Sequence, residues 1–200
     1  MAWAPDYVSA ADLAAYLRDP LADDLTEYGV WATAASRAID KRCNRQFGQL
    51  AAPAARVYRR PPVYDPTTAL WLLEIDDVQD MTGMLVNGVA FASSGAVLLP
   101  ANAPSDSQPW QRIGFTTEPT WSYPGAPVIY TITARWGWAA VPSQVVAAVK
   151  LQANRWNKRR DSPYGIAGSP DQGSEMRLLA KLDPDVSTTL AGLSRRRRVG

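Results

Sequence analysis

Apolar residues recur at helical spacing in three parts of the chain. In residues 9–19 and 23–44 they return every three or four positions, which predicts two consecutive helices with one buried face each. Ser9 stands at the start of the first segment and is a favoured N-cap residue. A third helix is predicted over residues 143–160, because Pro142 suits a first helical turn and the apolar residues again share one face.

Between the second and third helices, the period of the apolar residues falls towards two, which is the spacing of half-buried strands. The clearest strand is expected at residues 128–136. Asn87 and Gly88 stand between two apolar runs and predict a type I′ hairpin turn. Further strands are expected at residues 69–75 and 96–99. Five to seven such strands would form a small antiparallel sandwich or barrel.

This order of elements predicts an α+β protein. A helical layer of about three helices, two N-terminal and one after the sheet, would comprise residues 1–49 and 139–168. Residues 50–138 would form the inserted β domain. Residues 169–200 would form an extended C-terminal arm, because they carry too few large apolar residues for a second core.

The residue types present exclude most catalytic sites. The chain has no histidine, and Cys43 is its single cysteine, so a Cys/His zinc site is excluded. It has no glycine-rich phosphate-binding motif and no nucleophile elbow. The adjacent pairs Asp23-Asp24 and Asp76-Asp77 resemble turn or cap residues, and neighbours on a strand point to opposite faces. We therefore expect no enzyme, no cofactor and no metal.

No apolar run approaches the ~20 residues that span a bilayer, and the N-terminus lacks the pattern of a secretion signal. The net charge is only +2, yet Arg and Lys cluster at residues 56–60, 155–160 and 195–198. Such clusters commonly serve solubility, and nucleic-acid backbone contact is the more specific interpretation. Eight Trp and eight Tyr favour a protein with several interfaces or simply a Trp-rich core.

Several motifs occur in the order and spacing of one protein family. They are a Trp-Gly-Trp strand end at residues 136–138, a Val-Pro helix entry and an Arg-Arg-Asp-Ser-Pro exit. The opening segments 7–17 and 34–48 and the Leu-Asp-Pro-Asp-Val motif at residues 182–186 complete the pattern. Together they cover about half of the chain, which resembles the head–tail connector (adaptor, head completion) proteins of long-tailed bacteriophages.

The resemblance implies a structural virion protein without catalytic activity. Members of that family bind as a ring, typically twelve-fold, beneath the portal protein and receive the next connector (stopper) or the tail terminator. Double-stranded DNA passes through the lumen of the ring without sequence-specific contact. The protein would be assembled in the host cytoplasm and would lie at the head–tail interface of the virion. The β insertion is larger than that of the simplest members, which are nearly all helical.

The resemblance also implies that the C-terminal arm reaches the portal. Asp183, Pro184 and Asp185 form a helix-start pattern, and the short apolar stripe that follows needs another surface to pack against. The expected portal-binding residues are Leu182, Asp183, Pro184, Asp185, Val186, Leu190, Arg195, Arg196, Arg197 and Arg198.

The helical layer is expected to make the contacts between neighbouring subunits. Basic residues at the end of the third helix would meet acidic residues of the next subunit, and two apolar residues of the following loop would insert beside them. The expected inter-subunit residues are Arg155, Arg159, Arg160, Tyr164 and Ile166, facing Asp23, Asp24 and Glu27.

Two other functions fit parts of the sequence. One is a small nucleic-acid-binding domain in which Arg56 to Arg60 lie on a sheet edge and Tyr58 or Tyr64 stacks on bases. The other is an interaction domain without nucleic-acid contact. A ring would favour the connector, whereas a monomer with salt-sensitive DNA affinity would favour the nucleic-acid-binding domain.

Overall fold

The computed structural model describes residues 4–18, 25–118, 129–160, 166–167, 176–177 and 182–195. The chain is an α+β protein, as the sequence predicts, and it divides into two compact units. The helical unit contains Met1–Phe47 and Val141–Gly200. The β unit contains Gly48–Ala140 and is inserted between the two parts of the helical unit.

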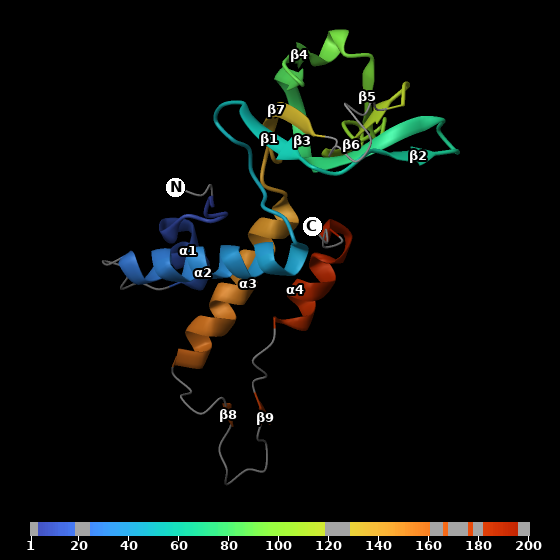
Figure 1. Cartoon of the computed structure of the whole chain (residues 1–200). Coiled ribbons are helices and arrows are strands. Elements are labelled where there is room, and N and C mark those ends of the chain that lie inside the picture. Colours follow the sequence, from blue (N-terminus) through green and yellow to red (C-terminus); the bar gives the residue numbers. More distant parts are fainter. Residues whose placement is uncertain are drawn as a thin grey trace. The chain divides into compact units, whose positions relative to one another are not determined.

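The helical unit is built around one long helix that contacts two others (Figure 1). Its helices are α1 (Ala10–Leu17), α2 (Thr26–Cys43), α3 (Ser143–Arg160), α4 (Pro184–Thr189) and the short 3-10 helix η3 (Ala191–Leu193). Helix α2 packs against α1 and α3, and α3 also packs against α4. Two-residue strands β8 (Ile166–Ala167) and β9 (Met176–Arg177) pair antiparallel.

The helix ends follow local rules. The side chain of Ser9 accepts a hydrogen bond from the backbone N–H of Asp12 at 3.0 Å, which confirms the predicted N-cap of α1. The second predicted helix, residues 23–44, ends close to where the sequence places its end, because the last helical residue of α2 is Cys43 and Asn44 is the C-cap. Asn44 has a φ of 52° and adopts the left-handed conformation that commonly closes helices, which asparagine tolerates better than most residues.

The predicted apolar stripe of α2 forms the centre of the helical core. Tyr28, Ala32, Ala35, Ile39 and Cys43 are all buried. The facing stripe of α3 is buried as well, at Val145, Ala148, Val149 and Ala153. Small residues on both helices allow the backbones to approach closely, so much of the core consists of short side chains.

The described residues of the β unit form one antiparallel sheet of seven strands, which is not closed. The sequence predicts a small sandwich or barrel without deciding between the two. The sheet is built around one long, irregular strand that pairs with two long neighbours and with two short strands. The strands are β1 (Ala54–Tyr58), β2 (Val63–Asp65), β3 (Leu70–Val86), β4 (Val89–Ala90), β5 (Ala96–Leu99), β6 (Trp110–Phe115) and β7 (Tyr130–Trp136).

The long strand β3 departs from the sequence prediction, which placed turn or cap residues at Asp76-Asp77. The strand continues through them with a register irregularity, pairing with β6 up to Glu74 and again at Val78, and with β7 from Val78 onward. Each carboxylate has a partner on another segment: Asp76 accepts from Arg56, and Asp77 accepts from the indole N–H of Trp138 at 3.2 Å. The two side chains therefore have separate partners and form no dyad.

The hairpin prediction is confirmed. Asn87 and Gly88 have φ angles of 49° and 81°, as a type I′ turn requires, and they connect β3 to β4. The core of the β unit is a single cluster of apolar side chains from the long strands. Its buried residues include Leu73, Ile75, Val78, Met84, Val86, Trp110, Ile113, Ile132, Ala134 and Trp136.

The two chain ends of the β unit are hydrogen-bonded to each other. The N–H of Trp138 donates to the carbonyl of Gly48 at 2.8 Å, and the N–H of Leu50 donates to the carbonyl of Trp136 at 2.9 Å. Gly137 lies between these bonds with a φ of 109°, and a Cβ atom there would lie 1.9 Å from the oxygen of Gly48. Only glycine fits this crossing.

We predict that Gly137→Ala destabilises the protein by about 1–3 kcal/mol from backbone strain alone, and by more once the clash with Gly48 is included. The measurement is urea unfolding of the full chain. Gly29→Ala is the matched control, because a Cβ at this position of α2 meets nothing within 4 Å. That substitution should stabilise the protein by about 1 kcal/mol, since alanine is the better helix former. Equal stability of the two variants would contradict the prediction.

Candidate interaction surfaces

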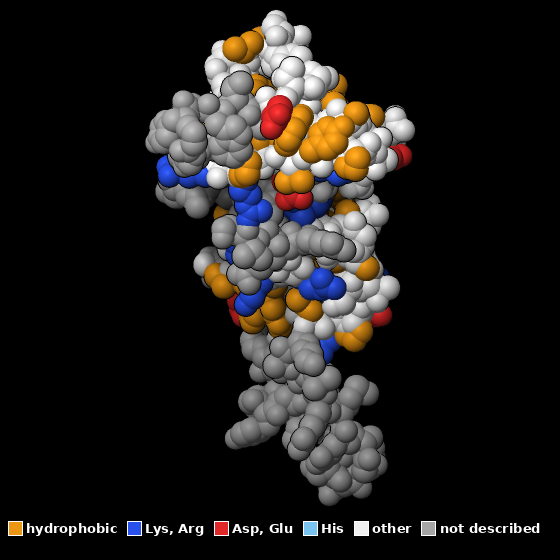
Figure 2. Space-filling model, turned by 45° about the vertical axis from the view of Figure 1, so that its right-hand side comes forward, with side chains coloured by type: hydrophobic (Ala, Val, Ile, Leu, Met, Phe, Trp, Pro, Cys, Tyr) orange, Lys and Arg blue, Asp and Glu red, His pale blue; other side chains and the backbone are white. Residues whose placement is uncertain are grey.

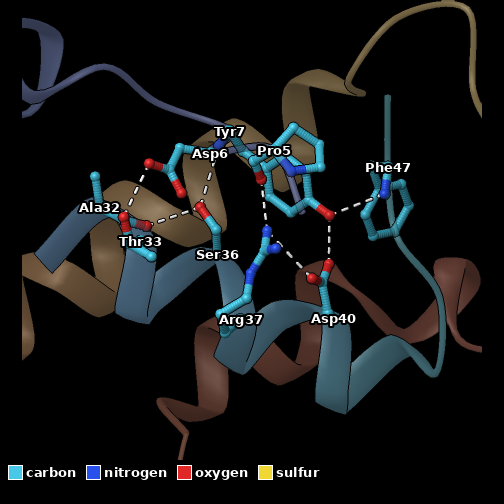
Figure 3. Close-up of polar contacts among 9 residues, drawn as sticks. All are labelled: Pro5, Asp6, Tyr7, Ala32, Thr33, Ser36, Arg37, Asp40 and Phe47. Atoms are coloured by element: carbon cyan, nitrogen blue, oxygen red, sulfur yellow. Dashed lines mark hydrogen bonds and ion pairs between the residues drawn. The ribbon is translucent and has the colours of Figure 1, made fainter. Parts of the chain in front are cut away.

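A polar network binds the N-terminal segment to α2 (Figure 3). The backbone N–H of Tyr7 donates to the hydroxyl of Ser36 at 3.1 Å, and that hydroxyl donates to the carbonyl of Ala32. The phenol of Tyr7 donates to Asp40 and accepts from the backbone N–H of Phe47 at 2.9 Å. The ring of Tyr7 meets that of Phe47 edge-on. Tyr7 thereby connects the N-terminal segment both to α2 and to the residues that follow it.

Arg37 completes the network. Its side chain turns to the N-terminal segment, where it donates to the carbonyl of Pro5 and pairs with Asp40 at 3.2 Å. Burial raises the pKa of Asp40 despite the opposing effects of Tyr7 and Arg37. Burial and the hydrogen bond to Asp40 also raise the pKa of Tyr7, so its phenol stays protonated.

The short helix α4 packs within the same chain. Val186, Leu190 and Leu193 are buried in the helical unit, and α4 contacts α3. The sequence correctly indicates that this stripe is too small to stand alone, but the surface that covers it belongs to this chain. Val186 and Leu190 are thus covered within the chain, whereas Pro184 and Asp185 are exposed, and contact of this segment with a portal stays a prediction.

The start of α4 is fixed by Asp183, as the helix-start pattern predicts. Its carboxylate accepts from the backbone N–H of Asp185 at 2.9 Å and from Arg155 of α3 at 2.7 Å. Burial raises the pKa of Asp183, but these hydrogen bonds outweigh it and leave the pKa lowered. Arg155 thus has an ion-pair partner within the chain, and its predicted contact with a neighbouring subunit stays a prediction.

A basic cluster surrounds the C-terminal end of α2. We define it as Lys41, Arg42, Arg45 and Arg195. The guanidinium of Arg42 donates to the Ser194 hydroxyl at 3.0 Å. The backbone of Arg195 is held at this helix end by two hydrogen bonds, from its N–H to Cys43 and from Asn44 to its carbonyl. Figure 2 shows Lys and Arg side chains at several separate places on the face in view.

The other predicted inter-subunit residues are placed only in part. Glu27 is exposed in the first turn of α2, where its carboxylate accepts from the indole N–H of Trp31 at 3.4 Å. Arg159 and Arg160 lie in the last turn of α3, and Ile166 lies in β8. Asp23, Asp24 and Tyr164 lie outside the described residues, as do Arg196, Arg197 and Arg198 of the predicted portal-binding set.

Two of the residues proposed for nucleic-acid contact, Arg56 and Tyr58, have partners within the β unit. Arg56 pairs with Asp76 at 2.7 Å and lies over the ring of Trp136. The hydroxyl of Tyr58 donates to the same carboxylate at 3.0 Å, and burial together with Asp76 raises its pKa. Neither side chain is thus presented as a free phosphate contact or as a stacking platform.

Strand β2 carries Val63, the most exposed large apolar side chain in the described part of the β unit. Val63 is 70% exposed and Tyr64 is 49% exposed. Tyr64 lies against Trp71 of β3, with a ring separation of 5.3 Å. Tyr64 is therefore the exposed member of the two predicted stacking residues, and it forms a small aromatic surface with Trp71. Figure 2 also shows apolar side chains gathered on one side of the β unit.

Among the described residues, no group of three or more Cys, Asp or Glu side chains is placed to hold a metal ion. No described helix is long and apolar enough to cross a membrane. The surfaces defined above are therefore the candidate sites, and their chemistry is charge pairing and apolar contact.

Comparison with solved structures finds the same fold in phage-like particles. A chain of the neck of an empty gene transfer agent (GTA) particle, computed with C6 symmetry, matches with a TM-score of 0.57 and 20% sequence identity. The match covers 100% of this chain and 96% of that chain. The two proteins share a fold over their full lengths. No known family pattern and no curated protein matches the sequence.

A chain of the virion of a native gene transfer agent particle also matches, with a TM-score of 0.46 and 21% identity. That match covers 92% of this chain and 97% of that chain.

We predict that Asp40 makes the wild-type protein lose stability as pH rises. Because burial raises the folded-state pKa of Asp40 above its unfolded value of about 3.9, the native state binds more protons between those two values. The contribution of Asp40 is therefore most favourable below about pH 4 and declines as pH rises through the folded pKa. Urea unfolding of wild type and Asp40→Asn from about pH 3 to 7 measures how the difference between their free energies of unfolding changes with pH. A stability difference that moves in favour of wild type as pH rises would contradict the prediction.

A second prediction concerns the attachment of α4. Asp183→Ala removes the helix cap and the ion pair with Arg155 together, which should accelerate amide hydrogen exchange across α4 about tenfold. Asp185→Ala is the matched control, because this acidic residue of the same turn neither caps α4 nor pairs with Arg155. The prediction is wrong if the two variants exchange at the same rate.

Proposed function

We propose that this protein is a structural neck protein of a phage-like particle, and more specifically the head-to-tail adaptor that forms a ring beneath the portal. The observation that carries the proposal is the full-length fold match to a neck chain of a gene transfer agent particle. The motifs at both ends of the sequence support the same conclusion independently. In this role the protein links the DNA-filled head to the next connector or to the tail and catalyses no reaction.

The ring is proposed to contain twelve subunits, with double-stranded DNA passing through its lumen. Twelve-fold symmetry includes the six-fold symmetry with which the matching neck was computed. The helical unit would supply the contacts between subunits. Arg195, Arg196, Arg197 and Arg198 would supply the contact with the portal, since the apolar stripe of the arm is buried within the chain.

The decisive experiment is complementation of heads that lack this protein. Purified full-length protein should join portal-bearing heads, and electron microscopy should show an added ring at the portal vertex. Necks that assemble fully without the protein, or heads that gain no density there, would overturn the proposal.

We predict that a chain ending at Arg195 folds normally but no longer joins portal-bearing heads. The truncation keeps α4, η3 and the hydrogen bonds of Arg195 to α2, so the melting temperature should remain that of the full chain. Deletion from Asp183 onward is a poorer test, because it also removes buried Val186 and Leu190. Attachment at wild-type efficiency by the shorter truncation would show that the terminal arginines do not bind the portal.

A further inference from the structure

Four strands of the β unit form a row with a free edge at each end. Trp71 and Leu72 of β3 pair both with β2 and with β6, so these two strands lie on opposite sides of β3. Strand β5 pairs with β6 in turn, which makes the order in this part of the sheet β2-β3-β6-β5. In the described part of the chain, β2 and β5 each pair with a strand on one side only.

One row of side chains crosses these four strands from edge to edge. The register places its members directly beside one another, and they are Val63, Leu72, Gly114 and Val97. Residues paired in this way point to the same face of a sheet. The row ends in an exposed valine at each edge, because Val63 is 70% exposed and Val97 is 41% exposed.

Two observations place this row on the outer face of the sheet. The next row, formed by Leu73, Ile113 and Leu98, is buried in the core, and successive residues of a strand point to opposite faces. A Cβ atom on Gly114 would lie 2.8 Å from Leu70 Cδ1 and 3.1 Å from Val97 Cγ2. The side chains of Leu70 and Val97 therefore lie together over the glycine, away from the core.

The two edges lack the usual protection against pairing. Neither β2 nor β5 contains a lysine or an arginine, whereas natural edge strands commonly carry charged side chains. The carboxylate of Asp65 in β2 accepts hydrogen bonds from Thr67 and Thr68 of its own turn. Pro62 and Pro66 directly flank β2, so a partner strand pairs over a few residues only.

We propose that β5 of one copy pairs with β2 of the next, so that the sheet continues from copy to copy around the ring. The inference rests on the ring proposed above. A cyclic ring keeps neighbours in the same orientation and joins two different patches of each subunit. The four strands alternate in direction, so β2 and β5 run in opposite directions. A second copy in the same orientation therefore brings its β2 antiparallel to β5 of the first.

The side chains at the two edges also match. When the rows continue without a shift, Val97 of one copy lies opposite Val63 of the next, with Cβ atoms about 4.5–5.5 Å apart. The small Ala96 then lies opposite Tyr64 and leaves room for its half-exposed ring. A shift of one residue would place the two valines on opposite faces. A strand from another protein could pair with either edge alone, whereas a second copy covers both edges at once.

The test is disulfide cross-linking of a double variant, Val63→Cys with Val97→Cys. Within one copy the two cysteines lie three strand spacings apart, about 14 Å, which is too far for a disulfide. Across the proposed contact they are direct neighbours. The full-length variant is bound to portal-bearing heads that lack this chain and is oxidised. A gel run without reductant should show a ladder of covalent oligomers up to the size of the ring.

The two single variants make the test specific. A mixture of Val63→Cys and Val97→Cys should give dimers and nothing larger, because each copy then carries one reactive cysteine. Either single variant alone should give no cross-link. The native Cys43 is buried and does not compete.

A second pair of exposed valines supplies the matched control. Val57 of β1 is 55% exposed and Val89 of β4 is 49% exposed. The double variant Val57→Cys with Val89→Cys should give at least about ten times less cross-linked protein, since its cysteines do not meet those of a neighbour. Thermal melting of all variants detects any loss of folding, and electron microscopy shows whether the rings have formed.

Several outcomes would overturn the inference. Complete rings of the double variant without a ladder would do so. Dimers from one single variant alone would show a symmetric pairing of two identical edges, and a ladder from the control pair would place the contact at β1 and β4. If the double variant does not fold, absence of dimers from the mixed single variants decides the question. If wild-type protein itself adds no ring, the proposed function fails, whereas normal rings without cross-links reject this inference only.

Discussion

The buried face of α2 is the constraint on which the helical unit depends, because four other parts of the chain are attached to this helix. Helices α1 and α3 pack against it. The N-terminal segment is held through Tyr7, which reaches Ser36 and Asp40. The C-terminal segment is held through Arg195 at the other end of the helix. Both ends of the described chain are thus fixed to one element, and the small side chains of its buried stripe make room for them.

Sequence periodicity predicts the helices and the hairpin, because their signals are local. The stripe of α2, the Ser9 cap and the Asn87-Gly88 turn each depend on residues within a few positions of one another. The long strand β3 is not visible in this way. Asp76 and Asp77 resemble turn residues, and Gly83 interrupts the alternation. The strand forms because distant segments supply partners, such as Arg56 for Asp76 and Trp138 for Asp77.

In the candidate interfaces, too, local features can be predicted from the sequence, whereas contacts between distant residues cannot. The sequence reveals where cations cluster but not which of them already have an acidic partner. Arg155 is paired with Asp183, 28 residues away, and Arg37 reaches Pro5 and Asp40.

The hydrogen bonds that join the two chain ends of the β unit reduce the entropic cost of folding the helical unit. A long flexible insertion would oppose folding of the helical unit, because its two ends must be brought together. Here the bonds from Trp138 to Gly48 and from Leu50 to Trp136 close that loop inside the insertion itself. Once the sheet has formed, closing the chain between α2 and α3 costs about as much entropy as closing a short loop. The insertion can therefore vary in length at its far loops with little entropic cost to the helices that carry it.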